Sequence, residues 1–181
     1  AEALEAAASS IPGAVAALAD VGDPEAVAAM FERIKRDLGG LDILVNNAAV
    51  TRDSLLMMMR PEAWSEVLRV DLDGAFHCSR AALRAMIAGR FGRIVNVISP
   101  AAFLGKPGAA NYAAAKGALV ALTKTLAAEA ARHGVTVNAL CPGYVETELI
   151  AGMPEAERAQ AVARIPAGRF ASPEEIADAA L

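Results

Sequence analysis

The sequence has few cysteines, no surplus of basic charge and no long apolar run, and each of these absences excludes a class of protein. Its 181 residues include 2 cysteines, which cannot form a disulfide framework and are typical of a reducing compartment. Its 17 basic and 21 acidic residues give a net charge of -4, whereas a nucleic-acid-binding protein would be basic. No apolar run approaches the roughly 18 residues of a membrane helix, and Glu2 and Glu5 stand where a signal peptide would be basic. These absences predict a cytoplasmic protein.

Hydrophobic residues, by contrast, are abundant. They make up 55% of the chain and charged residues 21%, which excludes an intrinsically disordered protein. A chain of 181 residues is long enough to bury a core, and no linker or repeat divides it, so residues 1–181 are expected to form one domain. The chain begins at Ala1 and stops at Leu181 within alanine-rich, helix-like stretches, which indicates a piece of a longer protein.

Short apolar runs alternate along the chain with segments whose apolar residues recur at helical spacing. The runs that we interpret as strands are Ala14–Ala19, Leu41–Val45, Arg93–Ile98 and Val135–Leu140. The helical segments are Pro24–Leu38, Pro61 to about Ala88, Asn111–Arg132, Ala151–Ile165 and a last one that begins at Pro173. Strands that are apolar throughout and separated by helices predict an α/β fold with a doubly wound parallel sheet, covered on both faces in three layers (α/β/α).

Small or polar residues follow each predicted strand. Ligands of such a sheet bind in the crevice beyond the carboxyl ends of the strands, so these residues are expected to form one rim. They are Asp20 with Val21, Asn46 to Ala49, Ser99, and Pro142 with Gly143. Any one of them, taken alone, is better explained as a residue that simply ends a strand.

Tyr112 and Lys116 are the strongest local signal for chemistry. Their spacing places both side chains on one face of a helix. For a tyrosine to act as an acid or base near neutral pH, its pKa must fall by roughly 3 units from about 10, which corresponds to about 4 kcal/mol. One cation about 4 Å away supplies on the order of 4 kcal/mol, before desolvation costs. Ser99 could hydrogen-bond both the tyrosine and the substrate oxygen that receives its proton. By themselves, however, a Tyr and a Lys at this spacing are usually an ordinary pair on the protein surface.

The setting of this pair resembles the short-chain dehydrogenase/reductase family. The residues that carry the resemblance, in the family's order, are Asp20-Val21, Asn46–Ala49, Asn96–Ser99, Gly105–Gly117 and Pro142-Gly143. The likeness covers essentially the whole chain and implies a Rossmann-like fold that lacks the first βαβ portion and the last strand. That first portion would carry the glycine-rich phosphate loop, so the chain alone is expected to have no useful cofactor affinity.

The resemblance implies a role for each matching residue. Tyr112 would be the general acid in carbonyl reduction, Ser99 would position and polarise the carbonyl, and Lys116 would lower the pKa of the tyrosine and bind the nicotinamide ribose. The cofactor would be NADPH, with NADH as the alternative, and no metal is implied. The implied cofactor contacts are Asp20, Val21, Asn47, Ala48, Tyr112, Lys116, Pro142, Gly143 and Val145.

Two residues depart from the family's pattern. Asp71 stands where the family has a fourth catalytic residue, an asparagine whose backbone helps to hold a water that relays protons to the lysine. Its spacing from Trp64, Leu68 and Ala75 places it on the apolar face of its helix, where an unpaired carboxylate is costly. We expect a weakened proton relay, with a merely local cap or ion pair as the alternative. Ala49 replaces a glycine and either crowds the cofactor or lies in a turn that needs no positive φ.

Within the family, the likeness is strongest to the 3-oxoacyl-(acyl-carrier-protein) reductases of fatty-acid synthesis. It is carried by Asn46–Leu56, Pro142–Glu148 and Ile165–Ile176. The implied reaction is reduction of a 3-oxoacyl thioester to the 3-hydroxyacyl thioester, and Arg90 is the implied contact for acyl carrier protein. The segment from Thr147 to about Ile165 would be a mobile lid, with Ile150 and Met153 against the acyl chain.

Three alternatives stay open. The chain would instead be an acetoacetyl-coenzyme A reductase, a dehydrogenase of another alcohol or sugar, or a catalytically silent fragment that only packs against partner subunits. The helices expected over Trp64–Met86 and Tyr112–Arg132 resemble the family's dimer surface, so a homo-oligomer, either a dimer or a tetramer, is expected.

Overall fold

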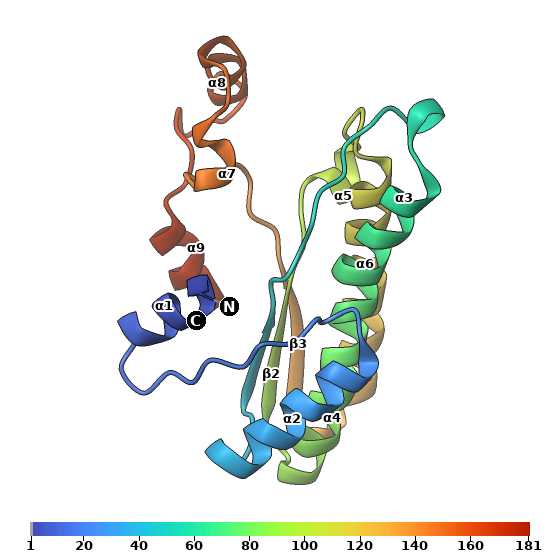
Figure 1. The fold of residues 1–181 in the computed structure, drawn as a ribbon, viewed down its shortest axis with the longest axis vertical. Helices are drawn as coiled ribbons and strands as arrows, with labels where there is room; N and C mark the ends of the chain where they lie inside the picture. The colour runs from blue at the N-terminus through green and yellow to red at the C-terminus, as the bar shows by residue number, and fades with distance from the viewer. Residues whose placement is uncertain (1) are drawn as a thin grey trace.

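Three parallel strands form the sheet at the centre of the molecule. The computed structural model describes residues 2–181, and its strands are β1 Ile43–Asn46, β2 Gly92–Val97 and β3 Val135–Leu140, hydrogen-bonded in that order (Figure 1). In register, Val45 lies opposite Val95, which lies opposite Asn138. Because all three strands run in the same direction, their carboxyl ends lie at one edge of the sheet, as the sequence predicts.

Helices connect the strands, and some of them cover one face of the sheet. They are α1 Glu2–Ser10, α2 Pro24–Leu38, α3 Pro61–Leu68, α4 Gly74–Gly89, α5 Ala101–Leu104, α6 Ala110–Ala130, α7 Glu148–Ala151, α8 Glu155–Val162 and α9 Pro173–Ala180. Shorter turns are the 3-10 turns η1 Leu56–Met58 and η3 Ala131–His133 and the π-helical turn η2 Arg69–Asp73. Figure 1 shows α2, α4 and α6 along the same face of the sheet.

The ends of α2 show how the local sequence sets such bounds. The carboxylate of Asp23 accepts a hydrogen bond from the backbone N–H of Glu25 at 2.9 Å, and Pro24 occupies the first turn. Gly39 ends the helix at a φ of 80°, a left-handed conformation that glycine adopts without steric cost. Both ends lie where the sequence predicts them.

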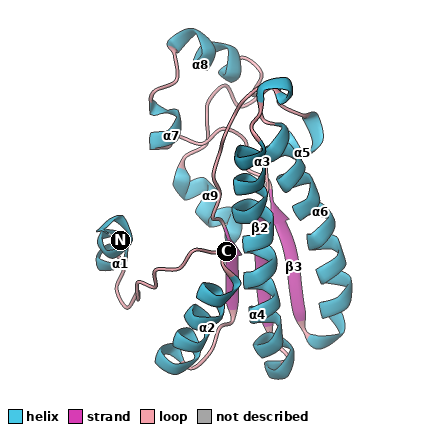
Figure 2. Cartoon of the chain, turned by 45° about the vertical axis from the view of Figure 1, so that its right-hand side comes forward, coloured by secondary structure: helices cyan, strands magenta, loops and turns pink. Residues whose placement is uncertain are grey.

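The core lies between the sheet and the helices of the covered face. A cluster of buried residues there consists of Ala82, Met86, Ile94, Ala130, Val135 and Val137. On the opposite face, Ile43 is 53% exposed and Val45 is 46% exposed, so this face of β1 is less covered than predicted. Figure 2 shows α1 set apart from the helices that pack on the sheet. The α/β class with a parallel sheet is confirmed, and the tight packing is on one face.

The strand predicted over Ala14–Ala19 is wrong. This run has no strand partner among the described residues and follows an extended path between α1 and α2, with Val15 and Leu18 exposed. A strand needs a hydrogen-bonded neighbour, and alanine has little preference for strands without one. Hydrophobicity alone therefore did not identify this element correctly.

The helix predicted from Pro61 to about Ala88 is confirmed with one local difference. Between α3 and α4 the chain forms η2, in which the N–H of Gly74 bonds to the carbonyl of Arg69, five residues back rather than four. Such π turns are rare and occur frequently at functional sites. Here the turn places Asp71 in its middle.

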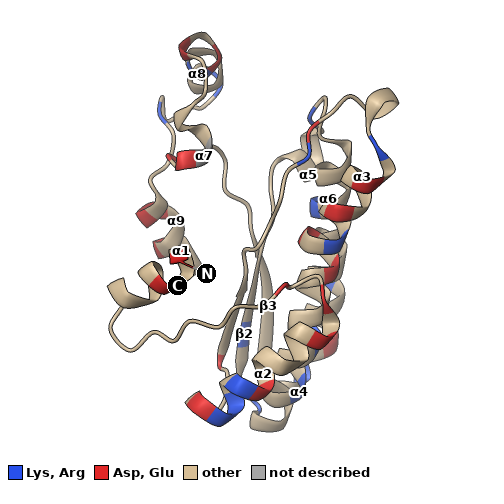
Figure 3. Cartoon of the chain, viewed as in Figure 1, with Lys and Arg blue, Asp and Glu red and all other residues tan. Residues whose placement is uncertain are grey.

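Charged residues of both signs are interspersed over α2 and α6 (Figure 3). Helices α1, α3 and α9 differ, because they carry acidic residues and no basic ones. They therefore contribute much of the negative charge of the chain. Among residues 2–181, no helix combines the length and the apolar character that crossing a bilayer requires.

Candidate active site

An amide network ties the strands to the helices at the carboxyl edge of the sheet. Asn46 Nδ2 donates hydrogen bonds to Asn96 Oδ1 at 2.8 Å and to Ser79 Oγ at 3.0 Å. Asn96 Nδ2 in turn donates to Thr123 Oγ1 on α6 at 2.8 Å. Asn96 is fully buried, and such buried polar groups destabilise a fold unless they are hydrogen-bonded. The network therefore fixes β1, β2, α4 and α6 relative to one another.

Lys116 is a buried cation at this edge. Its side chain on α6 is 3% exposed, and its Nζ donates to the carbonyl oxygen of Val97, at the end of β2, at 3.0 Å. The same nitrogen lies 3.5 Å from Asp71 Oδ2 and 5.5 Å from the centroid of the Tyr112 ring. Tyr112 and Lys116 thus share one face of α6, as their spacing predicts, but a carboxylate also faces the lysine.

Ser99 follows β2 and lies beside Tyr112. Its Oγ accepts a hydrogen bond from the N–H of Ala101 at 3.3 Å. Burial raises the pKa of the Tyr112 phenol above its ordinary value, the neighbouring hydroxyl of Ser99 lowers it only partly, and the charge of Asp71 raises it further. The expectation that a neighbouring lysine acidifies the phenol is therefore not met in this structure.

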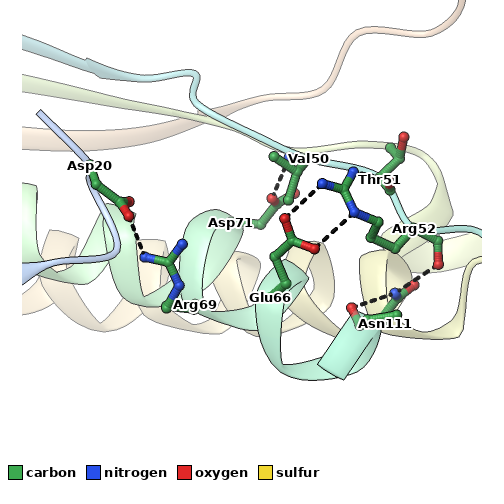
Figure 4. Close-up of polar contacts among 9 residues, drawn as sticks. Asp20, Val50, Thr51, Arg52, Glu66, Arg69, Asp71 and Asn111 are labelled. Carbon is green, nitrogen blue, oxygen red and sulfur yellow. Dashed lines mark hydrogen bonds and ion pairs between the residues drawn. The ribbon is translucent and has the colours of Figure 1, made fainter. Parts of the chain in front are cut away.

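Asp71 lies in the middle of η2 with its side chain completely buried. Its Oδ1 accepts a hydrogen bond from the backbone N–H of Val50 at 2.8 Å (Figure 4), whereas its Oδ2 has no hydrogen-bond partner within residues 2–181. Burial raises the pKa of Asp71 and lowers that of Lys116, because it disfavours the charged form of each, and each charge partly offsets this for the other. The spacing that placed Asp71 on the apolar face is confirmed.

A cavity of about 150 Å³ adjoins the end of β1. Among the residues that line it are Val21, Asn47, Ala48 and Asp71. Three of the predicted cofactor contacts thus meet at one hollow, together with the residue that departs from the family's pattern.

Asp20 lies beside this cavity rather than in its lining. Its carboxylate accepts a hydrogen bond from the N–H of Gly22 at 2.9 Å and forms an ion pair with Arg69 of η2 at 2.8 Å (Figure 4). These two contacts, the Gly22 bond first, lower the pKa of Asp20. The sequence reasoning did not foresee Arg69 as its partner.

Pro142, Gly143 and Val145 follow β3 and do not line the cavity. Val145 pairs with Ala171 in an isolated bridge, and the N–H of Glu146 donates to the carbonyl of Ala171 at 2.9 Å. This pairing joins the residues that precede the predicted lid segment to those that follow it. Instead of one helical stretch over Ala151–Ile165, that segment contains the two short helices α7 and α8.

Aromatic and charged contacts stabilise the chain around the Val145–Ala171 pairing. The rings of Tyr144 and Phe170 stack with their centroids 5.0 Å apart, and the guanidinium of Arg158 lies 4.6 Å from the centre of the Phe170 ring. Arg158 also forms an ion pair with Glu146. Of the predicted lid contacts, Ile150 lies in α7 and Met153 between α7 and α8.

Ala49 and Arg90 are two further predicted positions whose placement is clear. Arg90 is the one non-glycine residue with a positive φ among the described residues, so the turn at Ala49 needs no such conformation and the second interpretation of Ala49 is supported. Arg90 ends α4 and lies near Arg132, whose carbonyl accepts from its guanidinium at 3.5 Å. Because Arg90 precedes β2 and Ser99 follows it, the two lie at opposite ends of that strand.

Asn111 is a positioning residue to which the sequence reasoning gave no role. It is fully buried, and its Nδ2 donates to the carbonyls of Arg52 and Ala63 at 3.1 and 3.2 Å (Figure 4). Its Oδ1 accepts the N–H of Tyr112 at 2.8 Å. Asn111 thus joins the start of α6 to the loop after β1, and the preference of asparagine for helix N-termini was the available signal.

The chain is similar in sequence to known reductases and in structure to a known dehydrogenase. Residues 1–181 match the family described as enoyl-(acyl carrier protein) reductase. The 3-oxoacyl-[acyl-carrier-protein] reductases FabG of Vibrio cholerae and Escherichia coli are 45% and 42% identical over 160 residues, or 88% of this chain. A crystal structure of gluconate 5-dehydrogenase from Burkholderia cenocepacia, in complex with NADP and tartrate, matches 91% of this chain with a TM-score of 0.87 and 40% identity. The chain spans 66% of the length of the two reductases and 65% of the dehydrogenase.

Proposed function

Because the chain belongs to the short-chain dehydrogenase/reductase family, we propose that it acts as a nicotinamide-dependent reductase of 3-oxoacyl thioesters, forming 3-hydroxyacyl thioesters. The observation that carries this proposal is the meeting of Ser99, Tyr112 and Lys116 where β2 ends. The names of the relatives at 42% and 45% identity support a thioester on acyl carrier protein as the substrate.

Each of these three residues has one task in the reaction. The hydroxyl of Ser99 donates a hydrogen bond to the carbonyl oxygen of the substrate. Tyr112 transfers its phenol proton to that oxygen, and because burial raises its pKa, the transfer depends on stabilisation of the phenolate that it leaves. Lys116, anchored on the carbonyl of Val97, presents its ammonium to the phenolate that is left behind. When bound, NADPH, or alternatively NADH, supplies the hydride to the carbonyl carbon.

The residues at the carboxyl edge of the sheet could contact part of a nicotinamide cofactor. The cavity beside β1 offers apolar contact from Val21 and Ala48 and polar contact from Asn47. Asp20 lies beside it, with its carboxylate bonded to Gly22 and Arg69. On the other side of the site, Pro142, Gly143 and Val145 would contact the nicotinamide, and Tyr112 with Lys116 its ribose. The relative solved with NADP supports the phosphorylated form.

Other properties are proposed on the same relationship. They are a single domain over residues 1–181, a homo-oligomer, a cytoplasmic location, and acyl carrier protein as a partner through Arg90. Since Arg90 and Ser99 lie at opposite ends of β2, a carrier bound at Arg90 would not face the Ser99 of the same chain.

A sugar or alcohol dehydrogenase is the second candidate, because the structural relative at 40% identity is a gluconate 5-dehydrogenase. The test uses protein expressed from the complete coding sequence that includes residues 1–181. Consumption of NADPH is measured with acetoacetyl-carrier and acetoacetyl-coenzyme A, and reduction of NADP with gluconate. We expect the carrier thioester to give the highest kcat/KM, and Tyr112→Phe to lower kcat by about 100-fold or more. A preference for gluconate would overturn the thioester proposal, and Asp73→Asn, at an exposed position of η2, is the control.

A further inference from the structure

The mechanism above leaves one buried charged group unused, the carboxylate of Asp71. Its side chain is 0% exposed, and the side chain of Lys116 beside it is 3% exposed. Asp71 Oδ1 is satisfied by the N–H of Val50, but Oδ2 has no hydrogen-bond partner within residues 2–181 and lies 3.5 Å from Lys116 Nζ. The unpartnered oxygen therefore faces the cation of the site.

The two charges do not depend on each other equally. Lys116 Nζ also donates to the carbonyl of Val97, whereas Asp71 Oδ2 has only the lysine nearby, so the ammonium is held without Asp71 but the carboxylate is not held without Lys116. An isolated carboxylate or ammonium that is removed from water loses its solvation, and removing one partner of a buried pair leaves the other uncompensated. At 3.5 Å the two groups compensate each other directly. A lysine whose charge is cancelled in this way contributes less to any third group nearby. Here that group is the phenol of Tyr112, whose ring centroid lies 5.5 Å from Lys116 Nζ.

We propose that Asp71 cancels the charge of Lys116 and so keeps the phenol of Tyr112 protonated to higher pH than Lys116 alone would allow. Asp71 is then a positioning residue that acts through the lysine. The consequence for catalysis rests on the proposed reductase function, whereas the effect on the phenol does not. Burial and the charge of Asp71, both of which raise the pKa of Tyr112, agree with this arrangement.

The other charged and titratable groups near the phenol do not replace this pair. Lys106 and Asp53, on loops beside Tyr112, form an exposed ion pair with each other at 2.8 Å, so their effects on Tyr112 are opposed. Cys78 of α4 lines the same cavity as Asp71, but burial raises the pKa of its thiol and keeps it neutral.

The experiment measures the phenol directly and needs no cofactor. The chain has 2 tyrosines, so Tyr144→Phe leaves Tyr112 as the single one to follow by NMR during a pH titration. In this background, Asp71→Asn is expected to lower the pKa of Tyr112 by about one unit, because the ammonium then acts unopposed. The isosteric amide keeps the acceptor for Val50. Asp73→Asn, on the exposed side of the same turn, is expected to leave the titration unchanged.

Lys116→Met provides the second arm. Without the lysine, the buried carboxylate of Asp71 takes up a proton, so no net charge is left beside the phenol. The pKa of Tyr112 is therefore expected to stay close to its value in the Tyr144→Phe protein. If Lys116 instead acted alone on the phenol, Lys116→Met would raise the pKa of Tyr112 by about one unit. That result, or an unchanged titration in Asp71→Asn, overturns the proposal. Should Asp71→Asn fail to fold, the titration of Lys116→Met still decides, with the Tyr144→Phe protein as its reference.

Activity then provides a separate readout. Reduction requires the protonated phenol, so kcat/KM falls as pH rises through the pKa of Tyr112. In Asp71→Asn this alkaline limb is expected to move to lower pH by the same shift as the titration. Absence of reductase activity in the unsubstituted protein would refute the proposed function while leaving the titration result intact.

Discussion

Asn96 receives a hydrogen bond from Asn46 on the neighbouring strand and passes one to Thr123 on α6, both at 2.8 Å. A fully buried side chain thereby joins two strands and a helix below the site. Replacement by leucine of similar size removes the donor to the buried hydroxyl of Thr123 and the acceptor for the half-buried amide of Asn46. We expect Asn96→Leu to lower the free energy of unfolding by about 2 kcal/mol or more, measured by urea denaturation. Asn138→Ala, at an exposed position of β3, should cost far less, and equal losses would refute the role of the network.

Substitutions at two glycines would distinguish the cost of backbone strain from the cost of a steric clash. Gly39 and Gly134 have φ values of 80° and 77°, but a Cβ at Gly39 meets nothing within 4 Å, whereas one at Gly134 would lie 2.4 Å from the carbonyl oxygen of Arg90. We expect Gly39→Ala to cost about 1 kcal/mol, the strain alone, and Gly134→Ala distinctly more. Thermal unfolding of both variants checks this, and similar Tm values would contradict the contact argument.

The last helix depends on an ionised carboxylate. Glu175 accepts hydrogen bonds from Arg169 and from the N–H of Ser172, and these lower its pKa to about 2. Because the folded pKa lies below the unfolded one, this stabilisation is complete above about pH 4.5 and is lost as pH falls through about 2. Glu175→Gln should therefore weaken α9 at neutral pH, and the difference from the parent should vanish in that acid range. Circular dichroism across the range measures it, and a difference independent of pH would count against the account.

Arg158 is expected to restrain the segment that contains α7 and α8. It contacts both Glu146 and the ring of Phe170, so Arg158→Met removes an ion pair and a cation–π contact together. Amide hydrogen exchange in α8 should become several-fold faster, because local opening then breaks fewer contacts. Arg164→Met, at an exposed position beyond the same helix, is the matched control, and equal exchange in both variants would show that Arg158 does not restrain the segment.

The sequence predicts best those features that depend on local periodicity or on adjacent residues. The bounds of α2 follow from Asp23, Pro24 and Gly39, and Tyr112 and Lys116 share a helical face because their spacing dictates it. The burial of Asp71 follows from the same periodicity.

Features that depend on partners distant in the sequence could not be predicted from it. Ala14–Ala19 reads as a strand by hydrophobicity, yet strand formation depends on a neighbour elsewhere in the chain. The Asp20–Arg69 pair joins residues far apart in sequence, and no local pattern announces it. The raised pKa of Tyr112 depends on its burial and on Asp71, so the spacing of Tyr112 and Lys116 alone indicated the wrong direction.

The π turn at Arg69–Asp73 has a consequence for how the chain tolerates insertions and deletions. A π turn holds one residue more than an α-helical turn, because its hydrogen bond spans five residues instead of four. Losing one residue here would therefore restore α-helical spacing and leave α3 and α4 facing as they do now. Gaining one residue would instead advance the side chains before the turn by about 100°, so that Trp64 and Val67 would leave the surfaces they now occupy. A single added codon at this turn would misalign α3 against α6, whereas an added residue in a surface loop would be absorbed locally.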